Sequence, residues 1–122
     1  MVAVRDPRDM LLEWLAFGTS MPFALPDMAR AAAWLATVLS QLALLVDQQW
    51  YPNRVVHTDQ IGDDPAAAAA AMSEAMGIEL PVPATVGMPR FPPGHWREYA
   101  EPLAEPFAQL TPVAVAMGYP ER

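Results

Sequence analysis

The sequence contains no cysteine in its 122 residues. Disulfide bonds, thiolate metal sites and cysteine nucleophiles are therefore excluded, and cysteine usage gives no information on the redox compartment. Lysine is absent too, so all seven basic residues are arginines, against fourteen acidic residues. The net charge of −7 argues against a nucleic acid as partner, because binding to phosphates needs an excess of positive charge.

Recognisable catalytic and ligand-binding motifs are also missing. The sequence has no glycine-rich phosphate loop, zinc-finger pattern or EF-hand loop, and its serines lie in no serine-hydrolase motif. The N-terminal stretch MVAVRDPRD lacks the basic-then-apolar order of a secretory signal peptide, which favours a cytoplasmic protein or an assembly formed in the cytoplasm. We therefore expect no cofactor and no bound metal, and we favour a non-enzymatic protein.

The longest regular pattern lies between Pro26 and Tyr51 and predicts one amphipathic helix. At 100° per residue, apolar side chains gather on one half of this helix and polar side chains on the other. Pro26 and Asp27 suit its first turn, and Pro52 ends it after Tyr51 because proline disfavours the helical conformation before it. We expect the rest of the chain to pack around this helix.

The polar face of this helix carries no charge between Arg30 and Asp47. A helix face in water normally carries several charges, so we expect this face to contact another element or another chain. The side chains predicted for such an interface on this helix are Trp34, Gln41 and Leu44. A membrane span is the weaker interpretation, because the uncharged run falls short of the roughly 20 apolar residues that cross a bilayer.

A shorter helix precedes the long one. Asp6 and Pro7 suit the N-cap and the first helical position, and Gly18 suits the C-terminal end. The connection from this helix to the long one is short, so the two helices are predicted to form a hairpin.

A third helix follows the long one. Asp64 and Pro65 repeat the cap-then-proline pattern and begin an alanine-rich helix that closes at Gly77. Val55 and Val56 precede this helix and are candidates for a strand. We predict a loop there, because no second run of β-branched residues is available to pair with them.

Residues 78–94 are rich in proline and cannot form a long helix or a central strand. We predict an extended, stiff arm, and its apolar side chains are suited to lying in a groove. The side chains of this arm that we predict for an interface are Leu80, Val82, Met88 and Phe91.

From His95 onward the helical period returns, with aromatic and aliphatic side chains along one stripe and glutamates opposite. Pro102, Pro106 and Pro112 conflict with one straight helix. We therefore predict a kinked series of short helices, each with a proline in its first turn. The tail from Tyr119 is expected to be frayed.

Two groups of polar residues offer alternatives to a structural role. His57 and Asp59 share one loop, and such a pair can act as a general base when it is buried in a cleft, although no nucleophile accompanies it. The second group consists of His95, Glu98, Glu101 and Glu105. Its spacings of three, three and four residues could form a metal-binding ridge. We interpret the glutamates as a solvated face, because they lie opposite the aromatic stripe.

Together these patterns predict an all-α protein. We expect a helical core over residues 1–77, with helices at about 6–17, 26–51 and 64–76, then the proline-rich arm at 78–94. The kinked C-terminal segment at 95–122 is expected to pack on the core or on a partner. The predicted function is a structural, assembly or accessory subunit that acts through protein partners or as a homo-oligomer, as in large complexes such as virions. The alternatives are a helical domain that binds an apolar small molecule, a small enzyme subunit using His57 and Asp59, and a membrane-associated helical hairpin.

Overall fold

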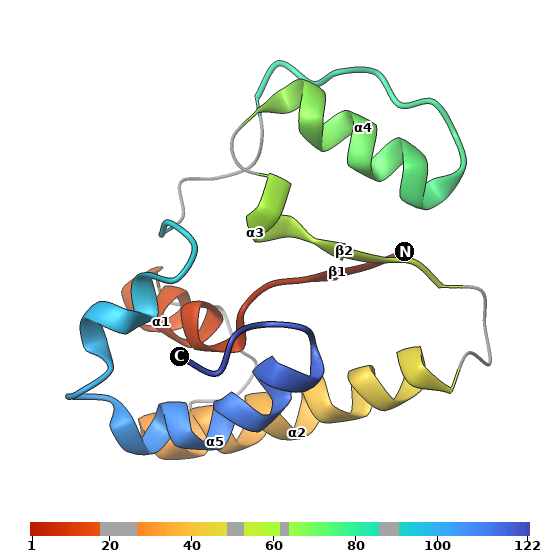
Figure 1. Ribbon diagram of the computed structural model, residues 1–122. Helices are drawn as coiled ribbons and strands as arrows, with labels where there is room; N and C mark the ends of the chain where they lie inside the picture. The colour runs from red at the N-terminus through yellow and green to blue at the C-terminus, as the bar shows by residue number, and fades with distance from the viewer. Residues whose placement is uncertain (18–26, 49–52, 62–63, 86–90) are drawn as a thin grey trace.

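The computed structural model describes residues 1–17, 27–48, 53–61, 64–85 and 91–122 (Figure 1). The protein is mostly helical, as predicted, and it also contains a small parallel sheet. In chain order the elements are β1 (Val2–Val4), α1 (Pro7–Phe17), α2 (Met28–Asp47), β2 (Val55–His57), α3 (Thr58–Ile61), α4 (Pro65–Met76), the 3-10 helix η1 (His95–Tyr99) and α5 (Ala104–Ala116). Figure 1 shows the two strands in the middle of the molecule, with α4 on one side and α1, α2 and α5 on the other.

Capping residues set the ends of α1 and α4. At the start of α1, Asp6 Oδ1 accepts a hydrogen bond from the backbone N–H of Arg8 at 3.0 Å. Asp64 caps α4 through the backbone N–H of Ala66 at 2.9 Å, and Gly77 ends this helix in the left-handed conformation with φ of 68°. The two aspartate caps and the glycine stop are the features that the sequence predicts at these positions.

The bounds of α2 differ from the prediction at both ends. The helix begins at Met28, and Asp27 stands outside it as the N-cap, because its side chain accepts a backbone N–H of the first turn at 2.7 Å. The helix ends at Asp47, before the predicted end at Tyr51. Residues 49–52, which include the predicted proline stop, lie outside the described residues.

The prediction of a loop at Val55 and Val56 is wrong. These residues belong to β2, which pairs in parallel with β1 in the register Val2–Val55, Ala3–Val56 and Val4–His57. A parallel partner must lie a long crossover away in sequence, and here α1 and α2 lie within that crossover. The prediction failed because it looked for a partner strand only in nearby segments. The partner is the stretch Val2–Val4, which lies about fifty residues earlier in the chain.

The core lies where α2 packs against α5, and α1 contacts both of them. Figure 1 shows α2 and α5 side by side, running in the same direction. The buried side chains of this core are Leu11, Leu12, Ala31, Ala32, Leu35, Leu39, Trp96, Phe107, Leu110 and Val113. The two alanines add little bulk to α2, so α5 can approach closely, while Leu35 and Leu110 fill the remaining space.

Helix α5 continues through Pro112, so the break predicted at this residue is not present. Proline lacks the N–H that would bind the Ala108 carbonyl four residues earlier. Both Pro112 and Ala108 are exposed, so water can bind this carbonyl, while Leu110 and Ala114 on the opposite face are fully buried. Burial of that face outweighs the cost of one interior proline, which is about 3 kcal/mol.

The prediction of a frayed tail from Tyr119 is also wrong. The Tyr119 side chain is buried. The carbonyls of Pro120 and Glu121 accept hydrogen bonds from the Arg8 guanidinium at 2.7 and 3.0 Å. The tail is ordered because its backbone supplies acceptors that a buried cation requires.

Candidate functional site

The RDPRD stretch at the start of α1 is buried. Arg5, Asp6, Arg8 and Asp9 are between 0 and 6% exposed. Charged side chains are almost never buried without partners, so each of them needs compensating contacts within the fold. Our sequence reasoning missed this cluster, although two arginines and two aspartates around one proline offered a signal for mutual pairing.

Arg8 has the most extensive set of partners in this cluster. Its Nε and Nη2 atoms donate to the Asp6 carboxylate at 2.9 and 2.7 Å, and the two tail carbonyls take its other donors. The guanidinium lies over the Trp96 ring, 3.8 Å from the ring centroid, and Arg97 lies over the same ring at 4.9 Å. A cation that is bonded and stacked in this way holds α1, η1 and the tail together.

Asp9 connects α1 to η1. Its two carboxylate oxygens accept the backbone N–H groups of Gly94 and Trp96 at 2.6 and 2.8 Å. Burial raises the pKa of Asp9, and the two hydrogen bonds oppose this rise because they favour the ionised carboxylate. Because each carboxylate oxygen accepts a backbone N–H of the segment that begins η1, Asp9 is interpreted as a structural residue that joins α1 to η1.

His57 and Asp59 are close in sequence, but they do not form the general-base pair that was considered as an alternative. Asp59 Oδ1 accepts the Tyr119 hydroxyl at 3.0 Å, and Oδ2 accepts the backbone N–H of Asp6 at 3.4 Å. The His57 ring packs edge-on against the Tyr119 ring with 5.2 Å between centroids. Its buried Nδ1 atom has no hydrogen-bond partner among the described residues.

The Tyr119 hydroxyl is neutral and donates its hydrogen bond to Asp59. Burial raises the pKa of Tyr119 well above its ordinary value, and the nearby Asp59 carboxylate raises it further. An ionised phenolate beside this carboxylate would face a like charge in a poorly hydrated site. The Asp59 carboxylate thus binds Tyr119 and the Asp6 backbone, and no hydrogen bond joins it to His57 among the described residues.

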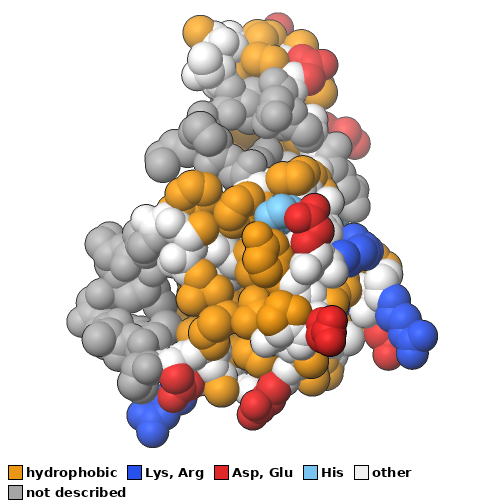
Figure 2. All heavy atoms as spheres, turned by 90° about the vertical axis from the view of Figure 1, so that its left-hand side faces the viewer, with side chains coloured by type: hydrophobic (Ala, Val, Ile, Leu, Met, Phe, Trp, Pro, Cys, Tyr) orange, Lys and Arg blue, Asp and Glu red, His pale blue; other side chains and the backbone are white. Residues whose placement is uncertain are grey.

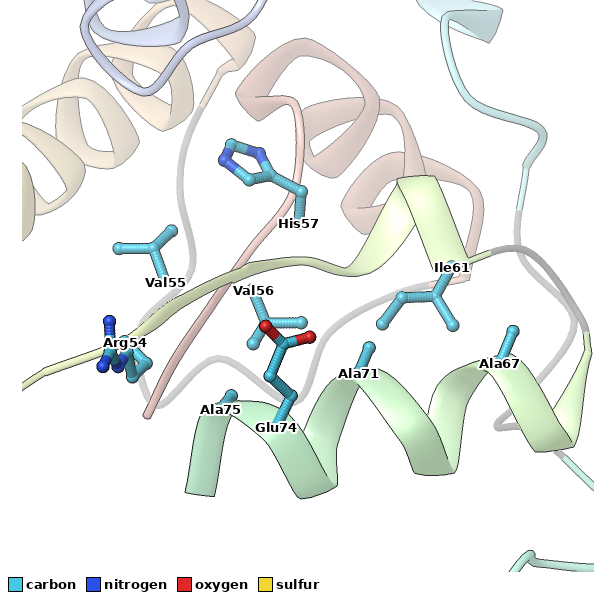
Figure 3. Close-up of a pocket in the computed structure, with 9 residues that line it drawn as sticks. All are labelled: Arg54, Val55, Val56, His57, Ile61, Ala67, Ala71, Glu74 and Ala75. Carbon is cyan, nitrogen blue, oxygen red and sulfur yellow. The ribbon is translucent and has the colours of Figure 1, made fainter. Parts of the chain in front are cut away.

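Two hollows lie on opposite faces of β2. The larger, of about 650 Å³, lies between β2 and α4 and includes Arg54 and Glu74 in its lining (Figure 3). In that view Val56 and the alanines of α4 point toward the hollow, whereas Val55 and His57 point away from α4. The smaller hollow, of about 370 Å³, is lined by the C-terminal ends of α2 and α5 and by Val55 and His57, which also border the larger hollow.

The three α2 residues predicted for an interface lie in different environments. Gln41 is exposed, and Leu44 is 55% exposed. Trp34 is half-buried, and its ring centroid lies 5.7 Å from that of Trp14 on α1. Two of the three side chains thus face solvent, while Trp34 packs on α1. Their contact with a partner stays a prediction.

The arm residues nearest α4 are mainly exposed. Val82 is 62% exposed. Leu80 is half-buried, and its backbone N–H donates to Ser73 Oγ of α4 at 3.0 Å. Met88 lies outside the described residues. The interface role of this part of the arm also stays a prediction.

Phe91, at the other end of the arm, contacts α1 of the same chain. Its backbone N–H donates to Glu13 Oε1 at 3.2 Å, and its carbonyl accepts from Arg5 Nη2 at 2.5 Å. Its ring lies 5.4 Å from that of Phe17 and 4.6 Å from that of His95, between centroids. Four contacts with its own chain thus hold Phe91, which was predicted for an interface.

The side of the molecule formed by α1 and η1 is also apolar. Figure 2, which views the protein from this side, shows hydrophobic side chains gathered over its middle, with charged side chains mostly toward the margins. Leu15, Phe17 and Tyr99 on these two helices are 48, 58 and 40% exposed. Exposed apolar surface is therefore not confined to α2.

The predicted acidic face is exposed at all three glutamates, Glu98, Glu101 and Glu105. His95 Nδ1 lies 3.3 Å from Glu98 Oε1, one turn away. Within the described ranges, no group of three histidine or carboxylate side chains is arranged to hold a metal ion. The arrangement matches the interpretation as a solvated face more closely than a metal-binding ridge.

Neither hydropathy nor comparison assigns a function. By length and composition α2 could cross a bilayer, with a mean hydropathy of 1.5 over its most apolar window, of which 22% is buried. This is weak support for a span, because core helices of soluble proteins pass the same test. The family models, curated proteins and solved structures compared with this chain include none that matches it.

Proposed function

We propose that this protein is a non-enzymatic subunit that acts through protein–protein contacts, with one face of α2 as its docking surface. This α2 face consists of Thr37, Val38, Gln41, Leu44 and Leu45. Its three apolar members are 39 to 55% exposed, and no charge lies between Arg30 and Asp47. Contiguous apolar exposure without accompanying charge is typical of an interaction surface. This observation carries the proposal.

The partner that we propose is a second copy of the chain, with the two α2 helices antiparallel. Arg30 and Asp47 are exposed at opposite ends of α2. An antiparallel pair brings Arg30 of each copy toward Asp47 of the other and aligns the helix dipoles favourably. The α2 face itself is uncharged, so the net charge of −7 is not concentrated at the contact.

The expected association is weak. Helix α2 has 20 residues and is about 30 Å long. A contact made by one face of such a helix is smaller than a standard interface, which buries about 1,200–2,000 Å². We therefore expect a dimer whose population depends on protein concentration.

The part of the proline-rich arm near α4, residues 78–85, is a second proposed contact site. Ile78 and Val82 are 52 and 62% exposed, and residues 78–85 form neither helix nor strand. The prolines lower the entropy that the arm would lose on docking. Because Phe91 is held by α1, only the part near α4 is proposed to meet a partner.

Light scattering over a range of protein concentrations tests the α2 face. We expect the wild type to shift from monomer to dimer, and Leu44→Glu to weaken association about tenfold or more, because the new carboxylate would be buried in the contact. Ala108→Glu, on the exposed side of α5, adds the same charge outside the α2 face and is the matched control. A wild type that stays monomeric at all concentrations, or equal effects of the two variants, would contradict the proposal.

A charge exchange tests the antiparallel arrangement. We expect Arg30→Asp and Asp47→Arg each to weaken the dimer, because each places like charges together at both ends of the pair. The double variant should recover association, since it restores opposite charges. A carboxylate suits the first turn of α2 and a guanidinium suits the last. Arg30→Asp also removes the exposed ion pair between Arg30 and Asp27, which contributes little to stability. A double variant weaker than both single variants would exclude this arrangement.

A further inference from the structure

One edge of β2 carries backbone groups that no partner strand uses. The Val2 N–H donates to the Arg54 carbonyl at 2.7 Å, so the backbone groups of Arg54 and Val56 face β1. Backbone groups alternate in direction along a strand, so the N–H groups of Val55 and His57 and the Val55 carbonyl face the opposite edge. None of these three groups makes a turn, loop or cap hydrogen bond among the described residues. This edge is therefore a template for a further strand.

The two hollows described above flank this edge. The side chains of Val55 and His57 point away from α4 (Figure 3), yet both residues line the larger hollow, which lies between β2 and α4. Both residues also line the smaller hollow, beside the ends of α2 and α5. The edge of β2 thus borders open space that has helices on both faces. Parallel sheets occur almost only where helices cover both faces, so a further parallel strand suits this position.

The arm residues nearest α4 have the sequence pattern of such an edge strand. Residues 79–83 form neither helix nor strand, and Val82 is 62% exposed. Leu80 and Val82 alternate with Pro81 and Pro83. Proline has no N–H, so within a sheet it is found on edge strands with its nitrogen toward solvent. When the two prolines face outward, the backbone groups of Leu80 and Val82 face inward and can pair with a neighbouring strand.

We propose that residues 78–85 of one copy supply a third parallel strand at the edge of β2 in a second copy. This inference rests on the contact role proposed above for these residues, and it names the surface that receives them. In a parallel register the Val55 N–H donates to the Leu80 carbonyl, and the Val55 carbonyl accepts from the Val82 N–H. The His57 N–H donates to the Val82 carbonyl. All three unused groups of the edge are then paired.

Side chains and charges favour the parallel direction. This register places Val82 beside Val56, on the face of the larger hollow, whose lining includes the alanines of α4. It also places Glu79, the one charged residue of the added segment, at the end of β2 where Arg54 is exposed. An antiparallel strand would bring Glu79 toward Asp59, which carries a like charge.

The strand comes from a second copy because the arm is held away from β2 of its own chain. The Leu80 N–H donates to Ser73 Oγ of α4 at 3.0 Å. Figure 1 shows the arm on the far side of α4 from β2. Pairing with another copy does not disturb the bond to Ser73, because the proposed register does not use the Leu80 N–H.

Amide hydrogen exchange of the full chain tests this pairing in the Leu44→Glu variant, in which docking through the α2 face is disabled. We expect exchange at Val55, His57 and Val82 to slow with rising protein concentration, about tenfold where roughly 90% of the chains are paired. The Val56 N–H faces β1 and is the internal control, with little change expected. Exchange at the edge amides that stays unchanged up to the solubility limit would overturn the inference. Slowing that is independent of concentration would overturn it too, because the strand would then come from the same chain.

This measurement separates the β2 edge from the α2 face. If Leu44→Glu associates as tightly as the wild type and the edge amides slow, the α2 face is wrong and pairing at β2 is supported. If Leu44→Glu associates more weakly and its edge amides stay unprotected at every concentration, the α2 face is supported and pairing at β2 is refuted.

Two proline variants in the same background locate the pairing within the arm. Val82→Pro removes the N–H that donates to the Val55 carbonyl, so the slowing at Val55 and His57 should be lost. Thr85→Pro is the matched control, because the N–H of this exposed residue faces away from β2 in the proposed register and its loss should leave the slowing intact. Both changes lie in an exposed part of the chain outside the helices, so the fold does not depend on them. Equal effects of the two variants would refute the register.

Discussion

At the scale of single residues, the contribution of Arg8 to stability can be judged from the groups that would lose a hydrogen-bond donor if it were replaced. The buried Asp6 carboxylate would lose its charged donor, and the carbonyls of the exposed residues Pro120 and Glu121 would lose theirs. Breaking a buried ion pair by removing one partner costs about 3–5 kcal/mol. We therefore expect Arg8→Met to lower the free energy of unfolding by about this amount, as measured by urea denaturation.

Arg97→Met is the matched control for this prediction. Arg97 lies over the same Trp96 ring but is exposed, so its loss should cost about 1 kcal/mol or less. A similar loss in the two variants would mean that stacking on Trp96, and not the ion pair with Asp6, accounts for the effect of Arg8.

The phenol of Tyr119 should stay neutral to unusually high pH in the folded protein. Its pKa is raised above the ordinary value of 10.0 by burial and by the Asp59 carboxylate. Because the folded state favours the neutral phenol, Tyr119 contributes stability below about pH 10, and this contribution is lost as the pH rises through the folded-state pKa. An absorbance titration of phenolate in the wild type and in Tyr119→Phe measures this step.

Asp59→Asn tests the cause of the raised pKa. Removing the negative charge should lower the pKa of Tyr119 while its burial remains. If the variant titrates like the wild type, burial alone sets the value. If Tyr119→Phe leaves the most alkaline part of the curve unchanged, Tyr119 is not the shifted group.

At the scale of elements, Pro112 is a site where α5 can be improved. Pro112→Ala restores an N–H that can bind the Ala108 carbonyl within the helix. We expect a gain of about 1–2 kcal/mol in the free energy of unfolding, less than the full cost of an interior proline because the more flexible unfolded chain offsets part of it. Thermal or urea unfolding measures the gain.

Pro106→Ala is the comparison for this change. Pro106 lies in the first turn of α5, where an N–H would have no partner within the helix, and its side chain is buried. We expect a loss of stability from the missing packing. A gain at Pro106 equal to that at Pro112 would show that the proline ring, and not the hydrogen bond, is responsible.

The elements that depend on local sequence could be predicted, and those that depend on distant pairing could not. Aspartate caps and glycine stops act within a few residues, so the helices at α1, α2 and α4 follow from the sequence. The strands β1 and β2 have three residues each and become recognisable only as a pair separated by two helices. The continuation of α5 through Pro112 depends on burial against α2, which a local cost for proline does not include.

The candidate sites were predictable only in their residue types. The uncharged face of α2 was visible as a pattern, and Leu44 is exposed on it. The sequence suggested His57 as a possible base beside Asp59. In the structure the Asp59 carboxylate accepts a hydrogen bond from Tyr119, and His57 lines a hollow whose other walls are mostly apolar. Tyr119 and Gly118 lie about sixty residues further along the chain, so no spacing rule connects them with His57.

At the scale of the whole molecule, the charge of −7 should make self-association depend on salt. Two copies repel each other at long range, and this repulsion is screened as ionic strength rises. The two Arg30–Asp47 pairs are expected to be solvent-exposed and to contribute little, so their screening matters less. We therefore expect light scattering to show a tighter dimer at higher salt. A dimer that dissociates on addition of salt would indicate a contact dominated by ion pairs.

The anchoring of the tail on Arg8 also has a consequence for synthesis of the chain. The hydrogen bonds from Arg8 to Pro120 and Glu121 join residues that are 112 and 113 positions apart. At about 5–20 residues per second, a ribosome needs roughly 6–22 s after Arg8 to make these acceptors. During this interval the tail carbonyls that accept hydrogen bonds from Arg8 do not yet exist, so the set of hydrogen bonds around the buried charges is incomplete. The RDPRD stretch is therefore made long before its surroundings are complete, and it reaches them only after translation has passed Glu121.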